Sequence, residues 1–196
     1  KSLPGVEVLV KSHDRFEKVY EDFVVVGSNT IDMSITTSKN FNEIHLGDKI
    51  RIDDDVRTTI GGGGINVLIC LSRLGAKCGY LGKISYENAP KIKELLTKNK
   101  IVLIDSKLSK RPVAKSIVVE TKDEDRVIFT YRGQNEYLEL HDFNVNAFKS
   151  NNFYFNSLSA ASFLTQIELA KIIKKKNKNA IICYNPSSYL IKSEPK

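Results

Sequence analysis

Four consecutive glycines, Gly61 to Gly64, stand directly before a run with the apolar spacing of a helix. Glycine allows the backbone to approach a ligand closely, and the free N–H groups at a helix start add positive potential. The run is not a P-loop, because no Gly-Lys-Ser or Gly-Lys-Thr follows it. It also fails the dinucleotide pattern G-x-G-x-x-G, because Asn66 or Val67 stands where the last glycine should be. A ligand-binding turn and a simple flexible turn both stay open on the glycines alone.

The elements around this turn alternate between buried strands and helices. Residues 23–27 form a short apolar run without alternation, which is typical of a strand buried on both faces. After the glycines, an apolar helical stripe ends at Gly75, a natural residue to follow a helix. The pattern then predicts strands at 76–84, 101–104, 152–157 and 180–184, with a helix that opens at Pro90 and another over 163–173. Such alternation predicts βαβ units, with helices on both faces of a mostly parallel sheet.

Two further segments contain strands of a different kind. Residues 33–60 mix Thr, Ile and Asn with charges, which indicates exposed antiparallel strands and turns. Residues 113–120 and 126–131 are rich in β-forming residues on either side of a charged turn, which predicts a hairpin. The two patches could pair with each other. We interpret residues 1–196 as one domain that carries this excursion of strands.

Composition limits the class of protein. The 196 residues are 41% hydrophobic and 27% charged, which is typical of a globular domain and excludes a wholly disordered chain. No stretch approaches the roughly 18 apolar residues of a membrane-spanning helix, and the first four residues lack the apolar core of a signal peptide. We therefore expect a soluble, cytoplasmic protein without a membrane partner. Three scattered cysteines, Cys70, Cys78 and Cys183, argue against a disulfide framework or a thiolate zinc site, and we expect buried thiols.

The charge balance does not identify a partner. A net charge of +7 is compatible with an anionic ligand or with nucleic acid. The densest basic run, residues 171–178, falls at the end of a predicted helix, where cations suit the helix dipole. No aromatic residues interleave a basic strand, and no recognition helix is evident. We expect no nucleic-acid partner, and such a domain stays only as an alternative.

Six motifs in order resemble the PfkB or ribokinase-like carbohydrate kinases. The first pair is Val26-Gly27-Ser28 with Ile31-Asp32, and Gly62-Gly63-Gly64-Ile65-Asn66 with Leu71-Ser72-Arg73-Leu74-Gly75-Ala76-Lys77. The others are Leu81-Gly82-Lys83-Ile84, Arg111-Pro112-Val113, Phe129-Thr130-Tyr131-Arg132-Gly133 with Asn135, and Asn185-Pro186-Ser187-Ser188-Tyr189-Leu190. The resemblance extends from about residue 23 to about residue 191. It implies a ribokinase-like three-layer α/β/α sandwich with a mostly parallel sheet and a small β-strand lid, built from about 33–60 and 112–131.

The resemblance also implies an activity and a set of substrate-binding residues. The activity is transfer of a phosphoryl group from a nucleotide to a hydroxymethyl group of a sugar. Asp32 would accept hydrogen bonds from two neighbouring sugar hydroxyls, and the Asn66 amide would both donate and accept. Gly62 and Gly63 would offer backbone N–H groups. Tyr131 and Arg132 stand where some relatives contact an anionic sugar acid, although an exposed strand-end arginine is the plainer interpretation.

The chain departs from the family in what it lacks. The family's catalytic Asp lies in a Gly-rich turn of the C-terminal half, and no such segment occurs here, nor does the Asn-x-x-Glu segment associated with magnesium. We therefore interpret residues 1–196 as an incomplete ribokinase-like domain without the C-terminal part, inactive by itself, with no catalytic or metal residue. ATP and Mg²⁺ are expected only for the full-length protein. The chain also departs from the family after Lys83-Ile84, where relatives usually have Gly-x-Asp and this chain has Ser85-Tyr86-Glu87-Asn88. The sugar affinity and specificity typical of the family are therefore not assumed for this chain.

Two points stay open at this stage. A non-catalytic sugar or nucleoside sensor with the same fold is the alternative to a kinase. Pairing of two lids into a homodimer is a further alternative that the sequence does not decide. The identity of the sugar, and the choice between ATP and ADP as donor, are not determined either.

Overall fold

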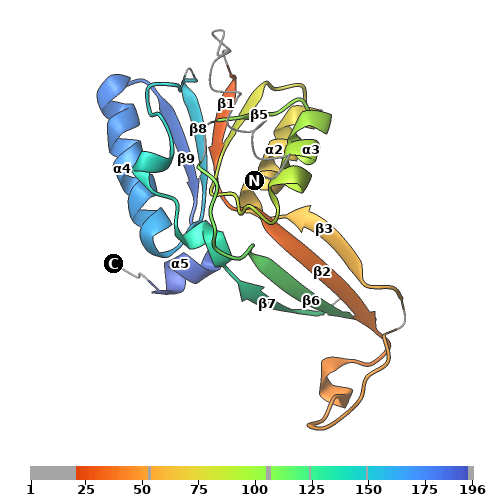
Figure 1. The fold of residues 1–196 in the computed structure, drawn as a ribbon. Helices are drawn as coiled ribbons and strands as arrows, with labels where there is room; N and C mark the ends of the chain where they lie inside the picture. Colours follow the sequence, from red (N-terminus) through yellow and green to blue (C-terminus); the bar gives the residue numbers. More distant parts are fainter. Residues whose placement is uncertain (1–20, 53, 105–106, 124, 149, 194–196) are drawn as a thin grey trace.

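Two separate β-sheets organise the chain, which the computed structural model describes for residues 21–52, 54–104, 107–123, 125–148 and 150–193 (Figure 1). The main sheet has five parallel strands in the order β5-β4-β1-β8-β9. Their bounds are β1 Phe23–Val26, β4 Cys78–Leu81, β5 Val102–Leu103, β8 Asn152–Asn156 and β9 Ile181–Asn185. Strand β1 is central, and its three valines are fully buried, as its unbroken apolar run predicts.

Helices cover both faces of the main sheet. Helices α2 (Gly63–Arg73) and α3 (Ala89–Lys98) lie on one face, and α4 (Ala160–Lys176) lies on the other (Figure 1). The side chains of β1 alternate between the two sides: Val25 packs in the core under α2 and α3, whereas Val24 and Val26 pack in the core under α4. The resulting three layers form the α/β/α sandwich that the resemblance implies.

The second sheet projects from the first, and we call it the lid (Figure 1). Its strands are β2 Thr30–Thr37, β3 Arg57–Gly61, β6 Lys115–Thr121 and β7 Arg126–Tyr131, in the order β3-β2-β6-β7. The β2–β3 and β6–β7 pairs are antiparallel, as expected, and β2 joins β6 in parallel. The two predicted patches of strands therefore pair with each other, and all six residues of β7 are exposed.

Several local predictions need correction. The strand predicted over 76–84 is limited to Cys78–Leu81, because the chain leaves the sheet at Gly82 and Lys83 turns to pair with Asp142. The lid begins at Thr30 rather than at residue 33, so Asp32 lies within a lid strand and not at the end of β1. Only Cys78 is buried, while Cys70 and Cys183 are exposed.

Proline and glycine mark the boundaries of two helices, as their backbone preferences predict. Helix α3 has a proline in its first turn. Helix α2 ends at Arg73 with Leu74 as its C-cap, after which Gly75 takes the left-handed φ of 92°. A short helix, α5 (Ser187–Ser193), follows β9, where no helix was predicted. Three single 3-10 turns, η2 Phe41–Glu43, η3 Gly133–Glu136 and η4 Leu140–Asp142, complete the elements. Within the described residues, no helix is long and apolar enough to cross a membrane.

Candidate functional site

The order of strands in the main sheet marks one place for a ligand. From β1 the chain moves outward to β4 and β5, and it then returns to the other side of β1 as β8 and β9. In open parallel sheets, ligands bind beyond the carboxyl ends of the strands at such a reversal point. Here that point lies between β1 and β8. Ser28 follows β1 there, and Asn156 is the last residue of β8.

The glycine turn meets the sheet at this reversal point. The Gly63 N–H donates to Ser28 Oγ at 3.1 Å, and Ser28 Oγ donates to Asn156 Oδ1 at 3.2 Å. A Cβ added at Gly64 would lie only 2.7 Å from the backbone carbonyl carbon of Gly27. The start of α2 therefore sits directly on the end of β1, at a separation that only glycine permits.

Asp32 and Asn66 come together above Gly61. A Cβ placed on Gly61 would overlap Asp32 Oδ2 and would lie 3.8 Å from Asn66 Oδ1. The carboxylate of a lid strand and the amide of the first turn of α2 thus approach the same point from two sides. Asp32 is half-buried, and Asn66 is exposed. The structure brings together these two residues, which are 34 positions apart in the sequence.

The surroundings of Asp32 shift its protonation. Burial raises the pKa of the Asp32 carboxyl above its usual 3.8, and a hydrogen bond with the Ser116 side chain partly opposes this rise. Ser116 stands beside Asp32 in the register of β2 and β6, and Thr130 stands beside Ser116 in β7. One face of the lid therefore presents a carboxylate and two hydroxyls side by side.

Tyr131 and Arg132 line a cavity of about 40 Å³ that adjoins the reversal point. The other lining residues come from the crossing after β1, from the lid and its two connections, and from the loop after β8: Ser28, Thr30, Ala114, Thr130, Asn135, Leu158 and Ser159. Ser28 belongs both to this cavity and to the glycine turn, so the two groups of predicted residues adjoin. The lid register places Tyr131 on the lid face opposite to Asp32, and its side chain is 54% exposed.

A larger cavity of about 360 Å³ lies elsewhere. It is formed by the opposite lid face and helix α3, with Ile31, Ile60 and Leu95 among its lining residues. None of the residues predicted to bind substrate lines it. We place the candidate site at the reversal point because the Asp32 carboxylate, the side-chain amides and the start of helix α2 converge there, whereas the volume of a cavity does not by itself indicate which chemical groups it binds. The Gly63 N–H, which was expected to be offered to the substrate, donates to Ser28 Oγ in this structure.

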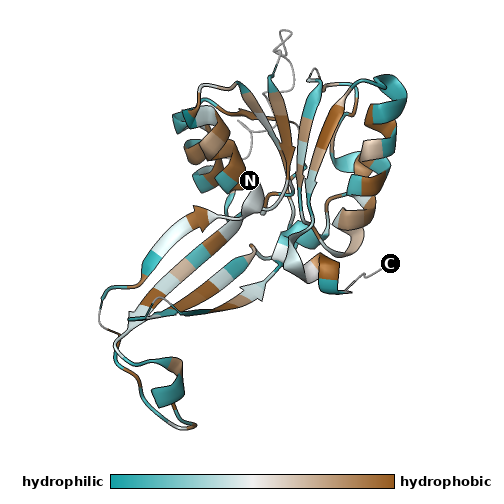
Figure 2. Cartoon of the chain, turned by 180° about the vertical axis from the view of Figure 1, so that it is seen from behind, coloured by the Kyte–Doolittle hydropathy of each residue, from teal (hydrophilic) through white to brown (hydrophobic). Residues whose placement is uncertain are grey.

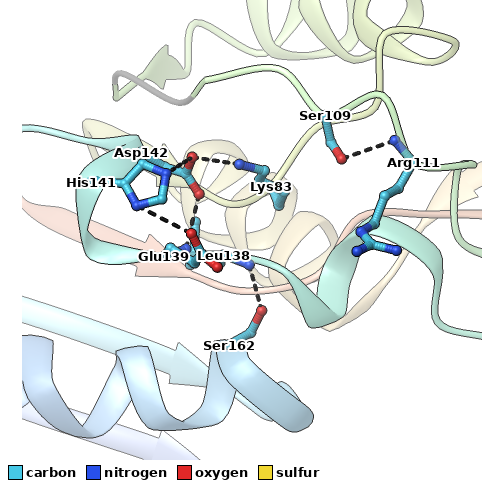
Figure 3. Close-up of polar contacts among 8 residues, drawn as sticks. All are labelled: Lys83, Ser109, Arg111, Leu138, Glu139, His141, Asp142 and Ser162. Carbon is cyan, nitrogen blue, oxygen red and sulfur yellow. Dashed lines mark hydrogen bonds and ion pairs between the residues drawn. The ribbon is translucent and has the colours of Figure 1, made fainter.

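A buried ion pair holds the loops beside the site (Figure 3). Lys83 Nζ contacts Asp142 Oδ1 at 2.5 Å, and the two side chains are 11% and 2% exposed. The other carboxylate oxygen of Asp142 accepts the Glu139 N–H at 2.9 Å, and the Leu138 N–H donates to Ser162 Oγ at 2.7 Å. This segment therefore joins the loop after β4 to helix α4.

Arg111, which is also drawn in Figure 3, supports the loop before the lid. Its guanidinium lies over the Tyr137 ring, 3.4 Å from the ring centroid. The Arg111 N–H also donates to Ser109 Oγ at 3.1 Å. These contacts fix the chain where it enters β6 and where it leaves η3.

The described residues do not fit a metal site. They include no group of three or more His, Cys, Asp or Glu side chains that could hold a metal ion. We therefore assign no step of a reaction to Mg²⁺ within this part of the chain. The side chains at the site instead suit recognition of hydroxyl groups, since they combine a carboxylate, amides and hydroxyls.

Sequence reasoning missed two polar residues of the site and singled out two others only as parts of motifs. Asn156 and Ser116 belong to no motif, whereas Ser28 and Thr130 were quoted within motifs without a role of their own. For Asn156 a signal existed, because a polar residue that ends a buried parallel strand faces the binding edge of the sheet. Ser116 and Thr130 depend on lid register, which the sequence does not display.

Comparison with solved structures gives the fold class. Ribokinase from Giardia lamblia has a TM-score of 0.76 at 17% identity, covering 87% of this chain and 52% of that one. Ribokinase from Cryptococcus neoformans var. grubii serotype A, in complex with ADP, has a TM-score of 0.71 at 17% identity, covering 90% and 53%. Adenosine kinase from Sinorhizobium meliloti has a TM-score of 0.72 at 18% identity, covering 90% and 60%. The fold is thus ribokinase-like, and the chain spans about half the length of these proteins.

The sequence comparison is more specific than the fold. The pfkB family of carbohydrate kinases matches residues 21–193. This chain belongs to that family. No curated protein matches the sequence.

Proposed function

We propose that residues 1–196 bind the phosphoryl acceptor of a pfkB-family kinase, a sugar, sugar acid or nucleoside with neighbouring hydroxyl groups. The observation that carries the proposal is the approach of Asp32 and Asn66 to one point above Gly61. An ionised carboxylate there accepts two hydroxyl hydrogen bonds, and the amide donates and accepts one each. Gly62 and Gly63 permit the ligand to lie against the backbone at the start of α2.

The two remaining predicted residues extend this site toward a region suited to a negatively charged group of the ligand. Arg132 lines the adjoining small cavity, and a guanidinium is suited to a carboxylate or phosphate in two-point contact. Tyr131 lines the same cavity. We propose that these two residues contribute when the ligand is a sugar acid, and that Asp32 and Asn66 contribute for every ligand.

Nucleotide binding and catalysis belong, in this proposal, to a part of the protein outside residues 1–196. The chain covers 53% of a ribokinase whose structure is in complex with ADP. The described residues also offer no metal cluster. We therefore expect this chain alone to give no measurable sugar phosphorylation with ATP and Mg²⁺. Robust product formation by the isolated chain would contradict this division of labour.

Ligand binding is tested by thermal shift with D-ribose, adenosine and D-gluconate as probes. At least one probe should raise the melting temperature of the wild-type chain, and Asp32→Asn should weaken its binding about tenfold or more, because hydrogen bonds to a charged acceptor are lost. Asp125→Asn, in the turn between β6 and β7, is the matched control and should bind as the wild type does. Equal shifts in wild type and Asp32→Asn would contradict the assigned pocket.

Arg132 is tested separately by the choice of probe. Arg132→Met should reduce the shift with D-gluconate and leave the shifts with the two uncharged probes unchanged. An equal loss for all three probes would contradict the sugar-acid role of Arg132 and would indicate a structural one.

We also propose that the lid pairs with the lid of a second copy. The lid face opposite to Asp32 carries apolar side chains in register, and Ile117, Phe129 and Tyr131 are 45%, 61% and 54% exposed. Exposed apolar surface of this kind indicates an interaction site. Phe129→Glu should convert a dimer to a monomer in light scattering, whereas Ile128→Glu, its neighbour on the opposite face, should not. A wild-type monomer at high concentration would contradict the pairing.

A further inference from the structure

The chain passes between the main sheet and the lid four times, and all four crossings meet at Asn29. The first crossing, from β1 to β2, contains Asn29 itself. The second contains Gly62, whose added Cβ would lie 3.0 Å from Asn29 Cα. The third enters β6 through Ala114, and the fourth leaves β7 through Gln134. Asn29 and Gln134 are both fully buried.

The amide nitrogen of Asn29 binds the main sheet. Asn29 Nδ2 donates to Tyr80 Oη and to the Lys83 carbonyl, both at 2.8 Å. Tyr80 lies in β4, and its hydroxyl in turn donates to the Gly27 carbonyl at 3.0 Å. Both N–H groups of the side-chain amide thus donate to residues outside the lid.

The amide oxygen and the backbone of Asn29 bind the returning chain of the lid. Asn29 Oδ1 accepts from Gln134 Nε2 at 3.0 Å, and the Asn29 carbonyl accepts from Asn135 Nδ2 at 2.9 Å. The Asn29 N–H donates to Asn135 Oδ1 at 3.2 Å. Gln134 Oε1 accepts the Ala114 N–H at 2.6 Å, which adds the third crossing to the same network.

At the junction of the lid with the main sheet, hydrogen bonds between buried amides take the place of apolar packing. Asn29, Gln134 and Asn135 are 0%, 0% and 6% exposed, so each amide would be costly to bury without its partners. Buried amides with all partners in place fix one arrangement, because each hydrogen bond depends on direction as well as distance. Asp32 lies three residues after Asn29, in strand β2, which begins directly after Asn29. The orientation of the lid at Asn29 therefore determines where the Asp32 carboxylate lies relative to Gly61.

We propose that Asn29, with Gln134, is the positioning residue that sets the angle of the lid on the main sheet. Only its consequence for ligand binding rests on the proposed function. The lid angle itself can be tested without a ligand, so the two proposals can fail separately.

The sharpest variant is Gln134→Glu, which changes one donor into a titratable group. When protonated, the new carboxyl keeps a donor for Asn29 Oδ1. When ionised, it places negative charge against the Asn29 and Asn135 oxygens, so burial and these acceptors raise its pKa. The variant should therefore hold the lid at low pH and release it as pH rises through that raised pKa.

Amide hydrogen exchange measures this release strand by strand. Relative to wild type at the same pH, Gln134→Glu should exchange β2 and β6 at least about tenfold faster at pH 8 and less than about threefold faster at pH 5. Strands β1 and β8 should change less than about threefold at both pH values. The proposal is overturned if lid and main sheet accelerate by the same factor, or if the lid is unaffected at pH 8.

A matched control places the same change in the main sheet. Gln166 is 2% exposed, and its Nε2 donates to the Asn156 carbonyl at 2.8 Å and to the Val26 carbonyl at 3.5 Å, at the ends of β8 and β1 and not at Asn29. Gln166→Glu should accelerate β1 and β8 at least as much as the lid. Selective acceleration of the lid in this control would also overturn the proposal, because any buried glutamate would then release it.

A measurement on the wild type covers the case in which Gln134→Glu does not fold. The Asn29 and Ala114 N–H groups, which donate to side chains of the network, should exchange as slowly as Val25 in β1. Val119, in the middle of β6, should exchange faster. Faster exchange at Asn29 and Ala114 than at Val119 would overturn the proposal.

Discussion

The main sheet and the lid are built on opposite principles. In the main sheet, parallel strands are covered by helices on both faces, and the side chains of β1 and β4 are almost fully buried. Among the described residues, no helix covers either face of the lid along most of its length (Figure 2), and every residue of β7 is exposed. The main sheet is therefore stabilised by its own core, whereas the lid depends on strand pairing and on its attachment at the crossings. The candidate site lies where the main sheet meets the lid.

The largest expected difference between the two regions is the loss of stability when an ion pair is broken. Asp142→Asn leaves the Lys83 ammonium, 11% exposed, without its carboxylate, and should lower the free energy of unfolding by about 3–5 kcal/mol. The lid control is Glu120→Gln, which breaks an exposed pair with Arg57 at 3.9 Å and should cost at most about 1 kcal/mol. Urea unfolding of both variants measures the contrast. Equal losses would show that the lid is as tightly built as the main sheet.

Truncating an apolar side chain should also cost more stability in the main sheet than in the lid. Leu81→Ala removes a fully buried side chain from β4 and should cost about 2–5 kcal/mol. Ile128→Ala removes a side chain that is 49% exposed in β7 and should change stability by about 0.5 kcal/mol or less. The same urea titrations compare the two. A large loss for Ile128→Ala would indicate that its lid face is covered in solution.

The junction of the glycine turn with β1 gives a smaller effect with an informative sign. Alanine normally stabilises a helix relative to glycine by about 1 kcal/mol. Gly64→Ala should instead destabilise by about 1–3 kcal/mol, because its Cβ would lie 2.7 Å from the Gly27 carbonyl carbon. Cys70→Ala, at an exposed position of the same helix, is the control and should be close to neutral. A stabilised Gly64→Ala variant would contradict the close approach.

The smallest expected effect on stability is at Asp32, and its sign separates function from folding. Burial raises the Asp32 pKa above 3.8, so the folded protein is more stable when this carboxyl is protonated. That contribution to the free energy of unfolding is lost as pH rises through the raised pKa and the carboxyl ionises. Near neutral pH, Asp32→Asn should therefore melt at the same temperature as wild type or slightly higher. This difference should shrink as pH falls below 3.8. Probe binding should weaken in the wild type as Asp32 is protonated, and melting curves across pH with and without D-ribose or adenosine measure both trends.

Much of the fold could be predicted from local pattern. The apolar run at 23–27, the helical stripe that ends before Gly75 and the β-rich hairpin at 113–131 correspond to β1, α2 and the β6–β7 pair. These elements follow from burial periodicity and from the backbone freedom of glycine, which act over a few residues. The strand predicted over 76–84 was too long, because the pattern does not show where a strand leaves its sheet.

The candidate site could be predicted only in part. Asp32, Asn66, Gly62 and Gly63 were named from motifs, and the structure places them around one point beside the reversal of strand order. Asn156 and Ser116 join them through strand pairing between distant segments. Tyr131, in contrast, falls on the lid face opposite to Asp32, since neighbouring residues of a strand point to opposite faces.

The sequence by itself determined the family, the alternation of strands and helices, and the glycine turn that starts α2. Those properties depend on residues that are close in the chain, so their pattern is visible without coordinates. Only the tertiary structure decided that Asn29 joins four crossings, that β2 pairs with β6 in parallel, and that Asp32 approaches Asn66. Each of these depends on register and direction between segments 34 to 106 residues apart, to which local periodicity is insensitive.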